Sequence, residues 1–207
     1  MWGVLEMAPP DKILALTQMF KDDKHPMKIN LGAGTYRDNN NQPLVLECVK
    51  KADELVKSMD HEYAPIDGLQ PFIKSSMELV YGKENSLLSK HGKHFASAQV
   101  LSGTGGLRVV FEMLALVASK REAAGLPSAA GSRDVYLPSP TWPNHPQIAM
   151  RAHLTPKTYR YYDAKRSVLD IDGLLEDFGS MPAGSNVLLH VCAHNPTGNY
   201  LINLLTY

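Results

Sequence analysis

Residues 96–123 read ASAQVLSGTGGLRVVFEMLALVASKREA, and this stretch decides the fold class. Its first six residues form a short apolar run typical of a strand, and the glycines that follow favour a tight turn. From Val109 to Ala123 the apolar residues recur at helical spacing, which predicts a long helix. A strand that turns sharply into a helix is the first part of a βα unit.

The same alternation continues through the second half of the chain. Strands are expected at DVYLP (134–138), KTYRYYD (157–163) and NVLLHVCA (186–193), and helices at HPQIAMRA (145–152) and DIDGLLEDF (170–178). Asp170 stands where it can cap the last of these helices. Strands and helices in this order favour βαβ crossovers and a mostly parallel sheet covered on both faces. The sequence therefore predicts an α/β fold.

The first half of the chain is less regular. Helical apolar spacing predicts helices at 11–20, with Asp11 as N-cap, at 45–56, and at 69–82, ending at Gly82. The segment KINLG (28–32) favours a short strand. The segment 123–132 is small, polar and rich in Gly and Pro, so a surface loop is expected there.

Composition and charge exclude several classes of protein. At 207 residues, 44% hydrophobic and 20% charged, the chain has the composition of a globular domain. Its 21 basic and 21 acidic residues cancel, which argues against a nucleic-acid partner. No secretory signal and no apolar run of the ~18 residues that a membrane span needs are present, so no membrane association is expected. Cys48 and Cys192 are expected to be reduced, buried thiols.

Three polar stretches directly follow expected strands: SGTGGLR (102–108), TWPNH (141–145) and HNPTG (194–198). In an open α/β sheet, ligands bind beyond the carboxyl ends of the strands. We therefore expect these three loops to converge on one binding site.

The first of these loops is suited to an anion. Gly103, Gly105 and Gly106 let backbone N–H groups approach a ligand closely, and the helix behind them adds its positive end. Ser102 and Thr104 supply hydroxyl groups. No Gly-Lys-Ser/Thr follows, and Arg108 takes the place of the last glycine of a dinucleotide fingerprint, so neither motif is present. The alternative is a glycine turn needed only for strand-to-helix packing.

The other two loops, and the expected strand 186–193 before the last of them, carry residues that allow two interpretations each. Trp142 is either a core residue or a ring that stacks on a cofactor. His145 and His190 could titrate, although single histidines are more often structural. Asn195 precedes a proline, so its amide either points into a cleft or closes an Asx turn.

Read together, the motifs are specific. The stretches EMAPPDKIL, INLGAGTYRD, PLVLECVKKAD, EYAPIDGL, SGTGGLR, PTWPNH, YRYYD and HVCAHNPTG, from Trp2 to Gly198, resemble the aspartate aminotransferase family of fold-type I pyridoxal-phosphate enzymes. The resemblance implies an incomplete large cofactor-binding domain at 44–198, and an N-terminal arm with part of a small domain at 1–43. Residues 199–207 form a tail that matches nothing in the family.

The resemblance also implies roles for individual residues. The residues that it assigns to pyridoxal 5'-phosphate are Ser102, Gly103 and Thr104 at the phosphate, Trp142 stacked on the pyridine, Asn195 at the phenolic oxygen, and Tyr63 at the phosphate of a neighbouring subunit. The resemblance also implies that Gly34, Trp142 and Asn195 contact the substrate. It implies that His145 and His190 lie behind the pyridine and steady its acidic partner. Gly106 departs from the family, which usually has a larger residue such as Ala.

The implied activity is that of an aspartate transaminase: amino-group transfer between aspartate and 2-oxoglutarate in a homodimer, in the cytoplasm or mitochondria. No lysine lies in a stretch resembling the family's Schiff-base motif, so no catalytic residue is assigned and a truncated chain is expected. The alternative function is a non-catalytic binding or regulatory fragment that associates with an intact aminotransferase subunit. A different phosphate-binding protein on a similar sheet is the third, remote hypothesis.

Overall fold

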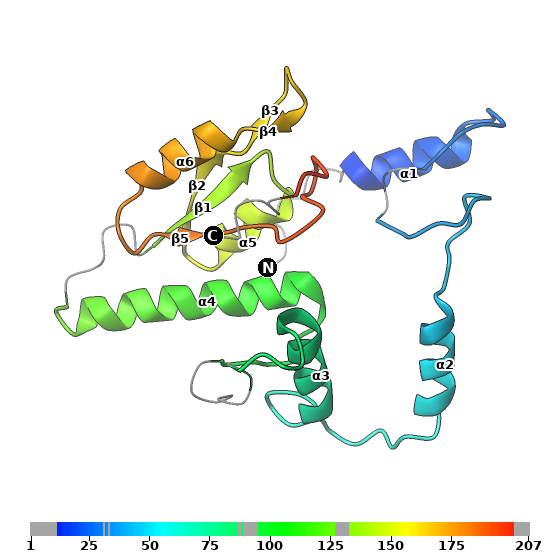
Figure 1. The fold of residues 1–207 in the computed structure, drawn as a ribbon, viewed down its shortest axis with the longest axis horizontal. Coiled ribbons are helices and arrows are strands. Elements are labelled where there is room, and N and C mark those ends of the chain that lie inside the picture. Colours follow the sequence, from blue (N-terminus) through cyan, green and yellow to red (C-terminus); the bar gives the residue numbers. More distant parts are fainter. Residues whose placement is uncertain are drawn as a thin grey trace, which may run out of the picture. The chain divides into compact units, whose positions relative to one another are not determined.

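The computed structural model describes residues 12–30, 32, 34–86, 88, 95–126 and 133–200 (Figure 1). The chain divides into two compact units, residues 1–63 and 64–207. Each unit is described by itself below. The predicted domain boundaries at residues 43 and 198 stay predictions, and the predicted N-cap Asp11 and most of the tail lie outside the described residues.

The first unit contains two helices, α1 (Lys12–Asp22) and α2 (Glu47–Val56), which confirm the helices predicted there. The strand predicted at 28–32 is wrong over its described residues 28–30, which pair with no strand. Instead the Lys28 N–H donates to the His25 carbonyl in a turn, and the Lys28 ammonium donates to the Phe20 carbonyl 2.7 Å away. These local bonds turn the chain back toward α1, so no second strand lies alongside.

The second unit begins with two helices. Helix α3 (Gln70–Tyr81) ends as predicted at Gly82, whose φ of 83° favours glycine and whose N–H donates to the Glu78 carbonyl. Helix α4 (Ser102–Ala123) contains the long helix predicted at 109–123, but it begins seven residues earlier, so the turn predicted at 102–108 is wrong and these residues form the first turns of the helix. Helix α5 (Asn144–Arg151) and helix α6 (Ile171–Ser180) confirm the remaining two helices.

A three-stranded parallel sheet forms the centre of this unit. Strand β1 (Asp134–Ser139) pairs along its whole length with β2 (Thr155–Arg160), from Asp134 opposite Thr155 to Ser139 opposite Arg160. Strand β5 (Asn186–Val187) pairs with the other edge of β1, giving the order β2-β1-β5. A separate antiparallel pair joins β3 (Tyr162–Asp163) to β4 (Val168–Leu169). The predicted α/β fold is confirmed.

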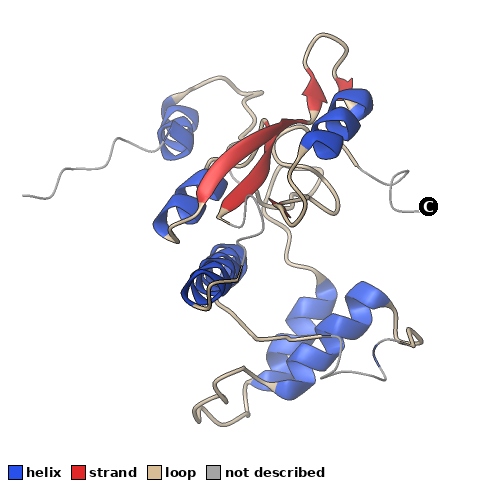
Figure 2. Cartoon of the chain, turned by 90° about the vertical axis from the view of Figure 1, so that its left-hand side faces the viewer, coloured by secondary structure: helices blue, strands red, loops and turns tan. Residues whose placement is uncertain are grey.

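Apolar side chains pack against both faces of the sheet. Figure 2 shows the helices and the strands of the sheet. Val135 and Leu137 on β1 face Phe111 of α4 and Ala149 of α5 in one buried cluster. On the opposite face a second cluster packs against α6; its buried members are Tyr159, Tyr161 and Leu174. Because successive side chains of a strand point to opposite faces, β1 contributes to both clusters, with Tyr136 on the α6 side.

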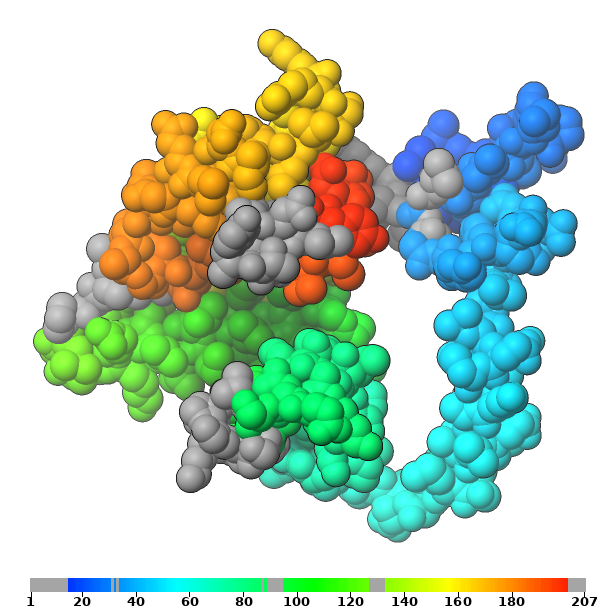
Figure 3. Space-filling model, viewed as in Figure 1, coloured from blue at the N-terminus to red at the C-terminus, as the bar shows by residue number. Residues whose placement is uncertain are grey.

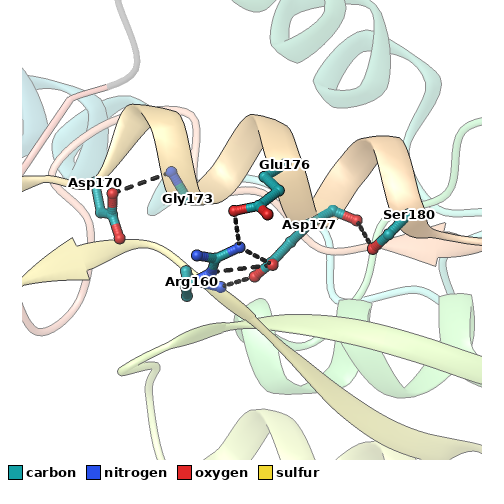
Figure 4. Close-up of polar contacts among 6 residues, drawn as sticks. All are labelled: Arg160, Asp170, Gly173, Glu176, Asp177 and Ser180. Carbon is teal, nitrogen blue, oxygen red and sulfur yellow. Dashed lines mark hydrogen bonds and ion pairs between the residues drawn. The ribbon is translucent and has the colours of Figure 1, made fainter.

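Polar contacts of Arg160, the last residue of β2, attach helix α6 to the sheet (Figure 4). Its backbone N–H donates to Asp177 over 2.7 Å, and its guanidinium donates to Asp177 and Glu176. At the start of the helix, the predicted cap Asp170 accepts a 3.1 Å hydrogen bond from the Gly173 N–H. A Cβ at Gly173 would overlap that carboxylate, so the cap requires glycine at this position.

Three expectations are corrected by the structure. Residues 96–101 form no strand: Leu101 is extended, with φ −82° and ψ 102°, but pairs with no described strand. An extended segment becomes a strand only when a ladder partner lies beside it. The strand predicted at 186–193 pairs only over Asn186–Val187, with Leu188 N–H still donating to the Tyr136 carbonyl. Cys48 and Cys192 are both exposed, not buried.

A membrane-spanning helix is absent from the described part of the chain, because none of its helices is both long enough and apolar enough.

Candidate functional site

The first turn of α4 lies toward the carboxyl end of β1 (Figure 1). Arg133, which precedes β1, forms a 2.9 Å ion pair with Glu122 at the end of α4 and a hydrogen bond with Ser119. Helix α4 therefore runs back along β1, and residues 102–106 lie toward the edge at which β1 ends. This placement agrees with the expectation that the glycine-rich segment stands at the carboxyl edge of the sheet, although no strand precedes it.

The start of α4 presents unpaired backbone donors. The first intrahelical bond runs from the Gly105 N–H to the Leu101 carbonyl, so the three preceding N–H groups have no partner within the helix. Leu101, at the N-cap, provides no side-chain hydrogen bond. Ser102 has φ 61°, a left-handed conformation uncommon outside glycine, and the space beside Gly103 is open. This terminus is suited to an anion.

Gly106 has a packing role as well. A Cβ at this position would lie 3.3 Å from Cγ2 of Val100, tighter than ordinary contact. The glycine thus lets residues 99–101 lie close against the first turn of α4. A larger residue at this position would require Val100 to move by a few tenths of an ångström.

Aromatic rings from the segments that follow β1, β2 and β5 are in contact one after another; we call this series of rings the column. Trp142 meets His145 edge-on with ring centroids 5.2 Å apart, and His145 meets His190 at 5.1 Å. His190 lies 4.2 Å from His194, whose ring stacks on Tyr161 at 3.9 Å. The structure therefore brings together two of the three loops that the sequence analysis expects to converge, those at 141–145 and 194–198.

Hydrogen bonds fix the orientation of these rings. Thr141 Oγ1 lies 2.7 Å from His145 Nδ1, and the Asn195 N–H donates to His190 Nδ1 over 3.1 Å. Because Nδ1 of His190 accepts this hydrogen bond, the proton of the neutral ring is on Nε2. Nε2 of His190 and of His194 are buried and have no partner among the described residues.

All three histidines favour the neutral form. Burial, with a smaller contribution from His190, lowers the pKa of His145 to about 4. Burial, followed by repulsion from His190 and His145, lowers the pKa of His194 to about 4 as well. Burial also lowers the pKa of His190. A buried imidazole loses its hydration when it is charged, so the cluster is uncharged at neutral pH.

The structure joins only some of the predicted site residues. Trp142, His145, His190 and Asn195 form one connected group, Asn195 through its backbone. Ser102, Gly103 and Thr104 share the exposed start of α4. Gly34 and Tyr63 belong to the first unit, and Tyr63 is 99% exposed. The roles assigned to all of these residues stay predictions.

Three residues that contact this group were assigned no role of their own, although the first and last lie in predicted site loops: Thr141, Tyr161 and His194. His194 is 1% exposed and its Nδ1 lies 3.0 Å from Thr197 Oγ1. Its position four residues after His190 is the available sequence signal, because both flank a turn that the sequence analysis already places at the site.

The donor groups present fit a phosphorylated organic cofactor better than a metal ion. The start of α4 offers N–H and hydroxyl groups to an anion, and Trp142, in the loop after β1, is partly exposed. Over the described ranges, no three His, Cys, Asp or Glu side chains come together in an arrangement that could hold a metal.

Comparison with known proteins assigns the class. Residues 26–202 match the family model described as aminotransferase class I and II, so the chain belongs to that family. The resemblance stated from the sequence motifs is therefore confirmed.

Curated relatives are aspartate aminotransferases. The mitochondrial enzyme of Gallus gallus is 46% identical over 199 residues, and the cytoplasmic enzyme of Oryza sativa subsp. japonica is 44% identical over 197. These alignments cover 95% and 94% of this chain but only 44% and 45% of the relatives. The chain thus spans less than half the length of the relatives it matches. Their locations are the two that the sequence analysis expects.

Solved structures agree on the fold. Aspartate aminotransferase from Saccharomyces cerevisiae cytoplasm is 33% identical with a TM-score of 0.79, over 95% of this chain and 45% of that one. An aromatic-amino-acid aminotransferase from Burkholderia pseudomallei, described as covalently bound to pyridoxal phosphate, is 31% identical with a TM-score of 0.81, over 95% and 46%. The fold of this chain is therefore that of fold-type I aminotransferases.

Proposed function

We propose that this chain forms the cofactor-phosphate and ring-stacking part of an aspartate transaminase, which transfers an amino group between aspartate and 2-oxoglutarate. The observation that carries the proposal is the start of α4, where three backbone N–H groups stand uncapped at the carboxyl edge of the sheet. The identity of 46% to an aspartate aminotransferase supports the choice of substrate.

Pyridoxal 5'-phosphate is the proposed cofactor. Its phosphate would be held by Ser102, Gly103 and Thr104, because N–H and hydroxyl donors at a helix N-terminus suit a dianion. When bound, the cofactor supplies an electron-withdrawing pyridinium ring that accommodates negative charge developing on the substrate. Trp142 would lie against that ring.

The histidines of the column are neutral, so they add no charge to this side of the site, and they hold Trp142 and Asn195 in position. His190 and His194 each bury an Nε2 atom without a partner, and the N–H on His190 Nε2 is a donor that an acceptor group could use. His145 is held by Thr141 on one side and contacts Trp142 on the other, so it positions the tryptophan ring. Asn195, anchored to His190 through its backbone, would present its amide to the cofactor and substrate.

Tyr63 and Gly34 complete the proposal. Tyr63 is almost fully exposed, which suits a side chain that reaches the phosphate of a neighbouring subunit in a homodimer. The space beside Gly34 is open, as the approach of a substrate to this segment requires. Both residues lie in the first unit.

A chimera tests this function. Residues 1–198 of this chain would replace the matched part of the Gallus gallus mitochondrial enzyme, and aspartate-dependent formation of glutamate from 2-oxoglutarate would be measured. We expect turnover in the chimera, and its loss by about 10²-fold or more when Trp142→Ala removes the stacked ring and misplaces the cofactor. This chain alone is expected to show no turnover, since it offers no lysine in the required sequence context.

Two results would count against the proposal. A chimera that folds and absorbs as a cofactor complex but does not use aspartate would exclude the substrate assignment. Equal turnover by the chimera and its Trp142→Ala variant would exclude the role of the ring.

A further inference from the structure

Strand β2 lies at one end of the three-stranded sheet, because the strand order is β2-β1-β5. The Thr155 N–H donates to the Arg133 carbonyl over 2.8 Å, so the backbone groups of Thr155 point toward β1. Backbone groups of successive residues alternate between the two edges of a strand, which places those of Pro156, Thr158 and Arg160 on the side away from β1. We call these three residues the outer edge of β2. None of the described strands pairs with it.

The outer edge of β2 offers one N–H donor where its length would provide three. Pro156 has no backbone N–H, and proline is tolerated in a sheet where the missing donor would have faced solvent. The Arg160 N–H already donates to the Asp177 carboxylate over 2.7 Å (Figure 4). Among the described residues of this edge, the Thr158 N–H is therefore the donor that remains for an incoming strand.

Arg160 itself holds the Asp177 carboxylate in place beside the outer edge. Its guanidinium donates to Oδ1 of Asp177 from Nε over 3.0 Å and from Nη2 over 2.6 Å, while Oδ2 accepts from the backbone N–H. In the space-filling view, α6 (orange) and the hairpin of β3 and β4 that follows β2 (yellow) form one continuous surface (Figure 3). Helix α6 thus brings a fixed acceptor to the end of β2.

We propose that the outer edge of β2 is built to exclude strand addition, so that a second copy of this chain cannot continue the sheet there. A strand added at this edge would bury carbonyl groups opposite Pro156 and Arg160 without a donor to meet them, which costs free energy. Lys157, exposed on the same strand, adds a charge of the kind that edge strands use against pairing. This property of the edge is independent of the proposed transaminase function.

Disulfide cross-linking at the middle of the edge tests the proposal. In a chain with Cys48→Ser and Cys192→Ser, Thr158→Cys places one thiol on the outer edge. In an antiparallel pair of such edges, two of these thiols come within the range of a disulfide. We expect little cross-linked dimer of this chain in a redox buffer. Adding Pro156→Thr, which restores a donor, and Asp177→Ala, which frees the Arg160 N–H, should raise the dimer-to-monomer ratio by about tenfold or more.

Leu175→Cys is the matched control for association elsewhere on the molecule, because Leu175 is 52% exposed on α6. The two edge changes should leave cross-linking at this position unchanged. An equal rise at Leu175→Cys and at Thr158→Cys would show general aggregation and would overturn the proposal, as would no rise at Thr158→Cys. Pro156→Thr alone leaves the contacts of α6 intact and should raise the ratio about fivefold, so the test does not depend on the folding of the Asp177→Ala chain.

Amide hydrogen exchange supplies a readout in the unchanged chain. The Arg160 N–H is bonded to Asp177 and the Thr158 N–H faces outward, so exchange at Arg160 should be about tenfold slower. Asp177→Ala should raise the Arg160 rate to that of Thr158. Glu176→Gln is the control and should leave it unchanged, since Glu176 accepts from the guanidinium and not from the backbone. Equal exchange rates at Thr158 and Arg160 in the unchanged chain would overturn the proposal.

Discussion

The ring of His194 stacks on the ring of Tyr161, with centroids 3.9 Å apart and planes inclined by 19°. Both side chains are 1% exposed, and both carry a buried polar atom without a partner among the described residues, Nε2 of His194 and Oη of Tyr161. Burial raises the pKa of the Tyr161 hydroxyl and lowers that of the His194 imidazole. The stack therefore consists of two neutral rings, whose packing depends on neither becoming charged.

We expect acid pH to destabilise the second unit because it protonates the histidines of this column. The pKa values of His145 and His194 are about 4 in the folded chain, below the ordinary value of 6.5, so the unfolded state binds more protons between these values. Stability is complete above about pH 6.5 and is lost as the pH falls toward 4. The melting temperature measured by circular dichroism is expected to fall across this window.

The variant His194→Phe separates this effect from other acid effects. Phenylalanine preserves a flat ring against Tyr161 but cannot be protonated, and it gives up the contact with Thr197. We expect a shallower fall in melting temperature between pH 6.5 and 4 than in the unchanged chain. An identical slope in both proteins would show that His194 does not contribute to the pH dependence.

Phosphate should bind weakly at the start of α4 through Thr104 and the backbone donors. Charge-assisted hydrogen bonds contribute about 1.5–3 kcal/mol each, so inorganic phosphate is expected to bind with a Kd on the order of millimolar. Thr104→Val would weaken binding by about tenfold, as measured by phosphorus NMR. Thr158→Val on β2 is the control and should leave the Kd unchanged. Nanomolar binding to the unchanged chain would contradict this account.

Phe111 should be among the most sensitive core positions. Its ring is 3% exposed and joins α4 to β1 and α5. Phe111→Ala is expected to cost about 3–5 kcal/mol of unfolding free energy, because it removes apolar contact and leaves a cavity. Leu116→Ala, at a residue of the same helix that is 57% exposed, should cost far less. Urea denaturation of the two variants gives the comparison.

Asp177 should matter more for the attachment of α6 than its neighbour Glu176. Asp177 accepts from both the backbone N–H and the guanidinium of Arg160, and Glu176 from the guanidinium only. The hydrogen bond from the Arg160 side chain is the main cause of the lowered pKa of Asp177. Asp177→Asn should therefore lower the melting temperature at pH 7 more than Glu176→Gln. Equal effects would show that the backbone hydrogen bond is unimportant.

Sequence pattern predicted most of the second unit because its elements are determined locally. Helix α6 begins at a capping aspartate and α3 ends at a glycine with positive φ, and both signals are visible in the sequence. The strand predicted at 96–101 is wrong for a reason that the local sequence pattern does not reveal. Its backbone is extended at Leu101, but a strand needs a partner, and none of the described strands lies beside it.

The residues of the candidate site likewise fall into those that the sequence predicted and those that it could not predict. The segment containing Trp142 and His145 was predicted because it follows an expected strand, and a common sheet edge brings such loops together. His190 lies inside the expected strand 186–193, so only the family resemblance indicated it. Tyr161 could not be found in this manner, since it lies between two strands and reaches the column only through its stacking on His194. His194 is buried by tertiary packing, a property that a single histidine in the sequence does not reveal.

The register of the central sheet has a consequence for the order in which the chain folds. Each residue of β1 pairs with a residue of β2 twenty-one positions later, Asp134 with Thr155 being the first, so the pairing closes a short loop with α5 inside it. Pairings between nearby residues form faster than distant ones because less chain entropy is lost. The β1–α5–β2 segment is therefore expected to take shape on the ribosome before β5 and the histidine-bearing turn have emerged. The site is assembled onto a sheet that already exists.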